Sequence, residues 1–256
     1  MVKRMNKVGL LFYNEYEKFY RMTERSGVFG DLCRAACGGD IFLDGFGDMG
    51  QAERILAAMP GGSVQVLDVG CGDGGLLRYI RSRRDMGVHG FDFSEAAIGQ
   101  AKALAVPGDD FRVGVIGETD YPEAAFDMVI SMDSLYFAPD MAEFIGQVLR
   151  WLRPGGVFFA GYTEGDIMPL TGAAEKSLPA KAFRKWGMEY RAEDITRETY
   201  ELLVRKRRAA LALRERFEAE GAEEWYEMIM GQTAAAAGGY EEFSRQMVRY
   251  IFTAVK

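Results

Sequence analysis

Residues Val66 to Leu77 read V-L-D-V-G-C-G-D-G-G-L-L, and this stretch decides the fold of the chain. The apolar residues from Val64 to Val69 predict a parallel strand that is buried on both faces. The glycines from Gly70 to Gly75 then allow the backbone to turn sharply beneath a ligand. Leucines follow at helical spacing, so a helix begins there with its first amide groups pointing into the turn. A strand, a glycine-rich turn and a helix in this order predict a small-molecule site at the carboxyl end of a sheet strand.

The glycine turn by itself fits two classes of cofactor. Gly70, Gly72 and Gly75 satisfy G-x-G-x-x-G, and Asp92 follows about 20 residues later, where a dinucleotide-binding fold keeps its ribose-binding acid. A nicotinamide-dependent oxidoreductase is therefore compatible with the spacing. Asp68 argues against that interpretation, because a carboxylate next to the turn repels a pyrophosphate. A ligand with a cationic amino group is favoured by the same carboxylate.

Four segments in chain order carry a family resemblance. They are Asp68–Gly72 with D-x-G-x-G, Gly90–Ser94 at a second strand end, Phe126–Ile130 as a fourth strand, and Leu152–Gly156 reading L-R-P-G-G. Together they cover roughly Val64 to Tyr162, and their joint order is far more specific than any one of them. In these segments the chain resembles the class I S-adenosylmethionine-dependent methyltransferases.

The resemblance implies that S-adenosylmethionine is the cofactor. By position in the motifs, Asp92 accepts both ribose hydroxyls and Phe93 packs against the adenine. Many relatives carry an acid after the third strand that contacts the adenine amino group. This chain has Gly117 there, so that contact is expected from Glu118 or from the main chain. The expected cofactor-binding residues are Asp68, Gly70, Cys71, Gly72, Asp92, Phe93, Gly117, Glu118 and Met132.

The methyl acceptor is expected beside the ends of the fourth and fifth strands and under an N-terminal cover. Asp133 and Tyr136 are the expected catalytic residues: Asp133 orients a polar group of the acceptor, and Tyr136 forms an aromatic wall near the sulfonium. The competing interpretation is that Tyr136 only packs the next helix. Phe46 and Met49 equally fit an ordinary helix start. The expected substrate residues are Tyr13, Tyr16, Phe46, Met49 and Tyr162.

The chain offers no imidazole base at the expected site. His89 is the single histidine, and it falls inside the second strand, away from the ligand-facing end. This favours an amine or an acidic hydroxyl as the acceptor, because such nucleophiles lose a proton easily. Asp133 or a tyrosine is the alternative base. No metal site is expected, since no cluster of carboxylates and histidines is present and Cys33 and Cys37 lack further ligands.

Composition excludes several partners. The formal net charge is -7 and the isoelectric point is about 5.0, which argues against a nucleic-acid substrate because phosphate binding needs clustered Lys and Arg. The 3 cysteines form no even disulfide set, so a reduced cytoplasmic protein is expected. No apolar run approaches the ~20 residues that span a bilayer. The oligomeric state, monomer or dimer, stays open.

Hydrophobic periodicity predicts alternating strands and helices, and hence a mostly parallel sheet. The expected strands are 64–69, 88–91, 111–115, 128–132, 157–162, 186–190 and 246–256, and the expected helices are 10–22, 31–37, 48–59, 76–83, 94–105, 141–152, 200–220 and 225–230. The expected fold is α/β, a Rossmann-like seven-stranded sheet with N-terminal helices. The resemblance adds an antiparallel last strand and a helical insertion before it.

These elements predict four parts: an N-terminal helical cover over 1–60, a cofactor-binding core over 61–163, a crossover and helical lid over 164–245, and a last strand over 246–256. The expected function is methyl transfer from S-adenosylmethionine to a small-molecule acceptor by in-line displacement. The alternatives are an NAD-dependent oxidoreductase and a non-catalytic protein that binds S-adenosylmethionine.

Overall fold

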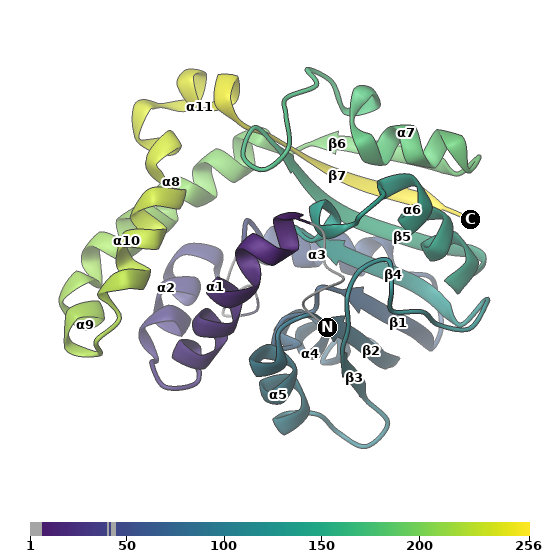
Figure 1. The fold of residues 1–256 in the computed structure, drawn as a ribbon, viewed down its shortest axis with the longest axis horizontal. Coiled ribbons are helices and arrows are strands. Elements are labelled where there is room, and N and C mark those ends of the chain that lie inside the picture. Colours follow the sequence, from purple (N-terminus) through teal and green to yellow (C-terminus); the bar gives the residue numbers. More distant parts are fainter. Residues whose placement is uncertain (1–6, 40, 42–44) are drawn as a thin grey trace.

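The stretch from Val64 to Val69 forms a strand inside a seven-stranded sheet (Figure 1). The computed structural model describes residues 7–39, 41 and 45–256. The strands are β1 (Val64–Val69), β2 (Met86–Asp92), β3 (Asp110–Val113), β4 (Phe126–Met132), β5 (Leu152–Glu164), β6 (Glu189–Asp194) and β7 (Val248–Val255). Their order is β3-β2-β1-β4-β5-β7-β6. Strand β7 runs antiparallel to both β5 and β6, whereas β1 to β5 are parallel to one another, which confirms the expected fold.

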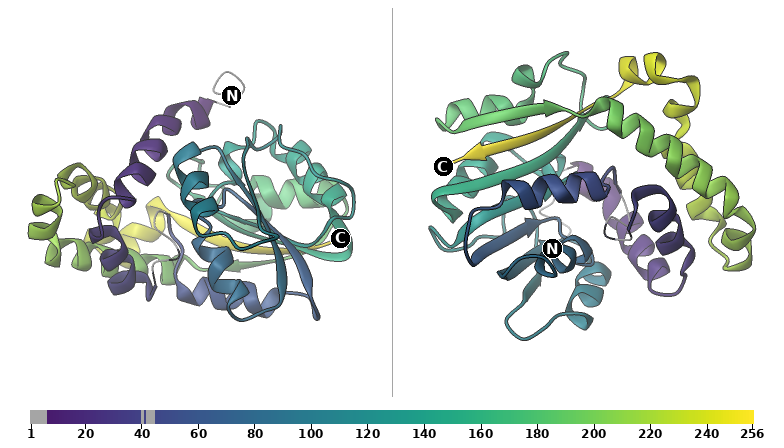
Figure 2. Two further views of the ribbon diagram at one scale, coloured as in Figure 1. Left: turned by 90° about the horizontal axis from the view of Figure 1, so that it is seen from below. Right: turned by 180° about the vertical axis from the view of Figure 1, so that it is seen from behind.

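Helices cover both faces of this sheet (Figures 1 and 2). They are α1 (Lys7–Thr23), α2 (Val28–Cys37), α3 (Met49–Ala58), α4 (Gly75–Arg81), α5 (Glu95–Ala103), α6 (Met141–Trp151), α7 (Leu178–Lys185), α8 (Thr196–Ala212), α9 (Arg214–Ala219), α10 (Glu223–Gln232) and α11 (Tyr240–Gln246). Side chains of α3, α4 and α5 share one core with the sheet. Side chains of α6 and α7 share the core on the other face.

Strand β1 shows why the sequence alternation builds two cores. Val66 belongs to the core under α3 to α5, and its neighbours Leu67 and Val69 belong to the core under α6 and α7. Successive side chains of a strand point to opposite faces, so a strand covered on both sides must be apolar throughout. All three side chains are fully buried.

The predicted helix starts carry the side chains that their first turns require. The carboxylate of Asp140 accepts a hydrogen bond from the Glu143 amide at 3.0 Å, and Asp48 accepts one from the Gln51 amide at 3.1 Å. Such caps satisfy amide groups that have no partner inside the helix. Asp48 therefore begins α3 as an ordinary cap.

The helices α1, α2, α8, α9 and α10 form an arm beside the sheet (Figure 1). Its centre is aromatic: Phe19 lies 5.1 Å from Phe29 and 5.6 Å from Trp225, centroid to centroid, and Phe29 lies 5.6 Å from Phe217. These edge-to-face contacts join residues near both ends of the chain. The arm is thus built from the N-terminal segment and the late insertion together.

Several late elements differ from the sequence expectation. Strand β6 begins at Glu189 rather than at Trp186, because the Trp186 indole packs on α6 and donates to the Ala142 carbonyl at 2.6 Å. The single helix expected over 200–220 is two helices that meet at Leu213. Helices α7 and α11 were not expected. Helix α7 and strand β6 belong to the sheet layers, and helices α8 to α11 follow them in the chain before β7.

No helix within the described ranges is long and apolar enough to span a membrane.

The turn after β5 generates a test of close packing. Gly165 has a φ of +102°, and a Cβ added there would overlap the carbonyl oxygen of Gln246, at the end of α11. Gly172, in the same loop, has a φ of +79° with open space around it. Gly165→Ala should therefore lower the free energy of unfolding by about 1–3 kcal/mol more than Gly172→Ala, since only the first adds overlap to backbone strain.

Urea unfolding followed by tryptophan fluorescence measures both variants against the unmodified chain. Equal destabilisation by the two substitutions would contradict the close packing of β5 and α11.

Candidate functional site

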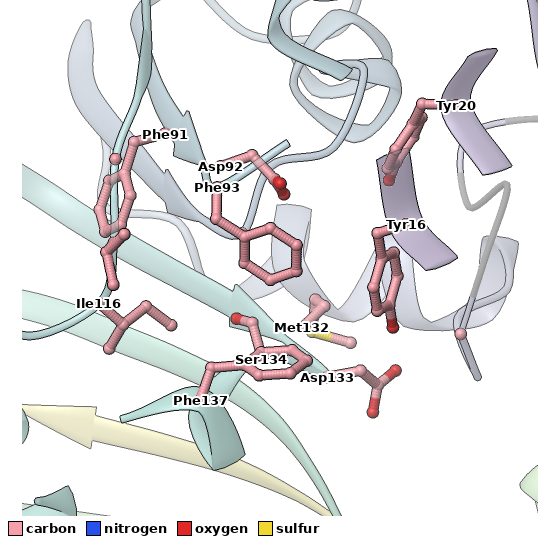
Figure 3. Close-up of a pocket in the computed structure, with 14 residues that line it drawn as sticks. Tyr16, Tyr20, Phe91, Asp92, Phe93, Ile116, Met132, Asp133, Ser134 and Phe137 are labelled. Atoms are coloured by element: carbon pink, nitrogen blue, oxygen red, sulfur yellow. The ribbon is translucent and has the colours of Figure 1, made fainter. Parts of the chain in front are cut away.

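A first hollow opens at the carboxyl ends of β1, β2, β3 and β4, where the chain order of the sheet reverses (Figure 3). It encloses about 700 Å³, its mouth included. Parallel α/β sheets bind ligands at this switch point. Its lining residues are Tyr16, Tyr20, Gly45, Gly70, Phe91, Asp92, Phe93, Gly114, Val115, Ile116, Met132, Asp133, Ser134 and Phe137.

Asp92 ends β2 and presents a carboxylate to this hollow. One oxygen accepts the Gly72 amide at 3.0 Å, and the other accepts the Ser94 amide at 2.9 Å. Burial raises the pKa of Asp92 to about 6. Burial, and then the charge of Asp92, raises the pKa of Asp68 to about 8. The two main-chain donors fix the Asp92 carboxylate and leave lone pairs free to accept hydroxyl groups of a ligand.

Neighbouring side chains pack closely against the backbone of the glycine turn. Gly70 has a φ of +76°, and an added Cβ would lie 2.6 Å from the Cβ of Ser134. Gly72 has a φ of +54°, and an added Cβ would overlap the hydroxyl of Tyr20. Only glycine meets both demands. The turn is therefore packed against the end of β4 on one side and α1 on the other.

Aromatic rings from three elements form one wall of the hollow (Figure 3). Phe93 follows β2, Tyr16 lies on α1, and Phe137 lies in the 3-10 turn Leu135–Phe137. Phe93 lies 5.6 Å from Tyr16 and 5.4 Å from Phe137, measured between centroids. Ile116 lines the hollow from the loop after β3. A flat apolar ring fits between such surfaces.

A second hollow adjoins the first and encloses about 1060 Å³, its mouth included. It shares Tyr16, Gly45 and Asp133 with the first. Its other walls come from the loop after β5 and from the ends of α10 and α11. Its lining residues are Phe12, Tyr16, Gly45, Phe46, Asp133, Tyr136, Gly165, Asp166, Ile167, Gly231, Gln232, Ala235, Gln246 and Met247.

Asp133, at the boundary of the two hollows, is paired with a buried arginine. The Arg249 Nη1 atom donates to the Asp133 carboxylate, and Arg249 is 0% exposed. The same carboxylate accepts the Phe46 amide at 3.2 Å and the Tyr136 hydroxyl at 3.0 Å. Burial alone would raise the pKa of Asp133, but the Arg249 charge and these hydrogen bonds hold that pKa below its ordinary value. Asp133 is thus a carboxylate in the folded chain.

Arg249 joins elements that are distant in sequence. Its Nη1 atom also donates to the Thr163 hydroxyl at 2.9 Å, and its Nη2 atom donates to the Gln51 side chain at 3.0 Å. Gln51 in turn donates to the Phe46 carbonyl at 2.8 Å. Strands β5 and β7, helix α3 and the segment at Phe46 therefore meet at one guanidinium. Sequence analysis missed this role, although an arginine on the same face of β7 as the buried Ile251 was a signal.

Tyr136 serves the same network. Its hydroxyl donates a hydrogen bond to Asp133. Burial is the larger cause and the charge of Asp133 the second cause that raises the pKa of Tyr136 far above its usual range. Its ring lies 6.0 Å from the ring of Tyr162. Tyr136 therefore keeps its proton at neutral pH while its ring lines the second hollow.

Comparison with known proteins identifies the core. Residues 67–160 match the family described as "Methyltransferase domain". Over 213 residues the chain is 28% identical to phosphoethanolamine N-methyltransferase 3 of Arabidopsis thaliana, covering 75% of this chain and 43% of the relative. The match to the ubiquinone biosynthesis O-methyltransferase of Paramagnetospirillum magneticum is 36% identical over 113 residues, 43% of either chain. The aligned parts span less than half of these curated relatives.

Residues 67–160 therefore form a methyltransferase domain. The fold of the chain is also that of a phosphoethanolamine N-methyltransferase 2 from Haemonchus contortus, solved with phosphomonomethylethanolamine and S-adenosylhomocysteine. That likeness has a TM-score of 0.72 at 20% identity and covers 93% of this chain and 59% of the other.

S-adenosylmethionine is the cofactor of this methyltransferase domain, and the residues of the first hollow fit it. Asp92 offers fixed acceptors for two hydroxyl groups, and Gly70 supplies the close approach that a Cβ would block. Phe93 and Ile116 offer an apolar slot of the kind that an adenine ring fills. Met132, the last residue of β4, also lines this hollow.

Four of the expected cofactor residues, Gly70, Asp92, Phe93 and Met132, line the first hollow of the methyltransferase domain, whereas the loop expected to contact the adenine does not. Gly117 and Glu118 are exposed and absent from its described lining, which Val115 and Ile116 supply instead. The physical reason is the turn at Gly117, whose φ of +88° leads the chain outward beside Pro139. Asp68, Cys71 and Gly72 lie behind the lining: Asp68 is 3% exposed and the Cys71 thiol packs on Gly90.

Some of the expected acceptor residues line the second hollow, and others do not. Tyr16 and Phe46 line the second hollow. Tyr13, Met49 and Tyr162 are absent from the described lining of both hollows. Tyr13 stacks behind Phe93 at 5.9 Å, Met49 packs on Gly38 and Gly39, and Tyr162 is buried in the sheet core. Within the described ranges, no three His, Cys, Asp or Glu side chains are arranged to hold a metal ion.

The Asp133–Arg249 pair generates a stability prediction. Arg249→Met should lower the free energy of unfolding by about 3–5 kcal/mol, because it leaves a buried carboxylate without its partner. Adding Asp133→Asn to that variant should recover part of the loss, so the two effects are not additive.

Arg191→Met is the matched control, because the Arg191 side chain is 78% exposed on neighbouring β6 and pairs with Glu193 at 3.3 Å. The Arg191→Met substitution should lower the free energy of unfolding by less than about 1 kcal/mol. Urea unfolding of the single and double variants gives the coupling energy. Strictly additive losses would show that the two side chains do not stabilise one another.

Proposed function

We propose that this protein transfers a methyl group from S-adenosylmethionine to a small-molecule acceptor, an amine or an acidic hydroxyl. The observation that carries the proposal is the meeting of the two hollows at Tyr16, Gly45 and Asp133. One hollow fits the methyl donor, and the other is open to a second molecule. A donor and an acceptor held on two sides of one boundary can react without diffusing through water.

When bound, S-adenosylmethionine supplies a methyl group on a positively charged sulfur, which already activates that methyl for displacement. The chain then has three tasks. Asp92 binds hydroxyl groups, the rings of Tyr16, Phe93 and Phe137 exclude water from an apolar slot, and Asp133 fixes the segment at Phe46 between the hollows. We propose that these residues orient the two reactants.

The titration of the boundary residues supports an acceptor that loses its proton easily. Asp133 has a lowered pKa, and Tyr136 has a raised pKa and donates a hydrogen bond to Asp133. Neither group is suited to act as a general base at neutral pH. The single histidine, His89, lies within β2, and its Nε2 atom forms a hydrogen bond with the Gln65 side-chain oxygen at 3.0 Å. We therefore propose that Asp133 and Tyr136 position the acceptor and that neither removes its proton.

We propose a reducing compartment and a small-molecule partner from the cysteines and the net charge. Cys33, Cys37 and Cys71 are free thiols, which supports a reducing compartment such as the cytoplasm. The net charge of -7 supports a small molecule rather than a nucleic acid as the partner. The relatives named above act, by their names, on small molecules.

Calorimetry of the full chain tests the proposal by measuring whether the chain binds S-adenosylhomocysteine. S-adenosylhomocysteine should bind, and Asp92→Ala should weaken that binding more than tenfold, about 1.4 kcal/mol, because two hydroxyl acceptors are removed. Asp127→Ala is the matched control, since Asp127 lies at the amino end of β4 and pairs with Arg153. Binding of NADH in place of S-adenosylhomocysteine would instead indicate an oxidoreductase, and cofactor binding without turnover on a panel of amines and phenols would indicate a non-catalytic protein.

The raised pKa of Asp92 predicts a pH dependence. An ionised carboxylate accepts hydroxyl hydrogen bonds better than a protonated one, so affinity for S-adenosylhomocysteine should fall as pH drops through about 6. The loss from pH 7 to pH 5 should be roughly tenfold for one linked proton. Asp92→Asn should bind more weakly and show little change over that range. A pH-independent affinity in the unmodified chain would contradict the assigned titration.

A further inference from the structure

We infer that the second hollow binds an acceptor with a cationic nitrogen on an apolar body, and that it does not accommodate a phosphate group. This inference rests on the proposed function, because it names the acceptor class of the same site. It is carried by the charges and rings that line the hollow.

The charged side chains in the described lining are both acidic. Asp133 and Asp166 line the hollow, and no lysine or arginine does so among the described residues. Asp133 is compensated by Arg249. Asp166 forms no ion pair with any residue that the structure describes, and it stands in the turn closed by the Gly165 amide and the Met168 carbonyl at 2.7 Å. The hollow therefore faces its ligand with an uncompensated negative charge at its rim.

The cations nearest this boundary are already engaged. Both terminal nitrogens of Arg249 donate to protein oxygens, and its guanidinium carbon lies 5.5 Å from the centroid of the Phe46 ring, which lines the hollow. Lys206 is 2% exposed and donates to the Gly45 carbonyl at 2.6 Å. A phosphate in the hollow would lose its hydration without gaining a charged donor, and burying an uncompensated charge is costly.

Aromatic rings supply the complementary surface. Phe12, Tyr16, Phe46 and Tyr136 line the hollow, and Phe12 and Tyr16 contact one another at 6.4 Å between centroids. Ring faces attract a cationic nitrogen and also pack against an apolar body. Asp166 is exposed at the rim of the hollow, and partial desolvation there raises its pKa. A cationic group of the acceptor beside Asp166 would supply an ion-pair partner, and an acceptor amine must release its proton to solvent before its lone pair can take the methyl group.

This acceptor class differs from that of two proteins the chain resembles. One is named a phosphoethanolamine N-methyltransferase, and the other was solved with phosphomonomethylethanolamine. Both molecules carry an amine and a phosphate. The lining of the second hollow favours the amine part alone.

Calorimetry on the full chain saturated with S-adenosylhomocysteine tests the inference with probes of matched size. The probes are phenethylamine, 2-phenylethanol and 3-phenylpropionate, which carry a cationic, a neutral and an anionic group, together with phosphoethanolamine. Phenethylamine should bind at least tenfold more tightly than 3-phenylpropionate, and phosphoethanolamine should bind more weakly than phenethylamine. Asp166→Asn should reduce the preference for the cation at least threefold.

Glu123→Gln is the control variant, because Glu123 is an exposed acid between β3 and β4 and outside both described linings. It should leave the preference unchanged. Equal affinities, tighter binding of the anion or of phosphoethanolamine, or no binding of the amine would overturn the inference. Binding of S-adenosylhomocysteine is measured first, so its failure would count against the proposed function, whereas failure of the amine preference alone would count only against this acceptor class.

Discussion

The ion pair between Asp133 and Arg249 is the constraint on which the geometry of the site depends. Asp133 stands at the end of β4 with a φ of +55°, a backbone conformation that side chains other than glycine rarely adopt. Its carboxylate binds Arg249 from β7, the Phe46 amide and the Tyr136 hydroxyl. A buried pair of this kind adds little net stability, but loss of one partner is costly. The pair therefore specifies where the last strand, the N-terminal segment and the boundary of the hollows lie.

The two hollows have different origins in the sequence. The first is made from strand ends and the glycine turn, and its form follows from local rules: φ above zero at Gly70, an acid after β2, and apolar strands. The second collects residues from α1, the segment at Phe46, the loop after β5 and the helices near the chain end. Proteins that share this fold can share the first kind of site, because strand ends and a turn form it. The second kind of site varies with the segments that each protein adds to the fold.

This difference explains how much could be predicted from the sequence. The sheet and the place of Asp92 at a strand end followed from motifs and periodicity, because each depends on neighbouring residues, whereas the antiparallel last strand was implied by the family resemblance. Arg249 and Asp166 were missed, since their roles arise from contacts with residues far away in sequence. Glu118 lies outside the described lining of the first hollow because the turn at Gly117 directs the chain outward, and Tyr162 lies outside both linings because its side chain is buried in the sheet core.

The central claim is that methyl donor and acceptor meet across the boundary at Asp133. A crystal structure of the chain with S-adenosylhomocysteine tests it most directly. The account predicts ribose hydroxyls within hydrogen-bond distance of Asp92, and the sulfur facing the boundary formed by Tyr16, Gly45 and Asp133. A ligand bound elsewhere, or with its sulfur turned away from the second hollow, would contradict the account.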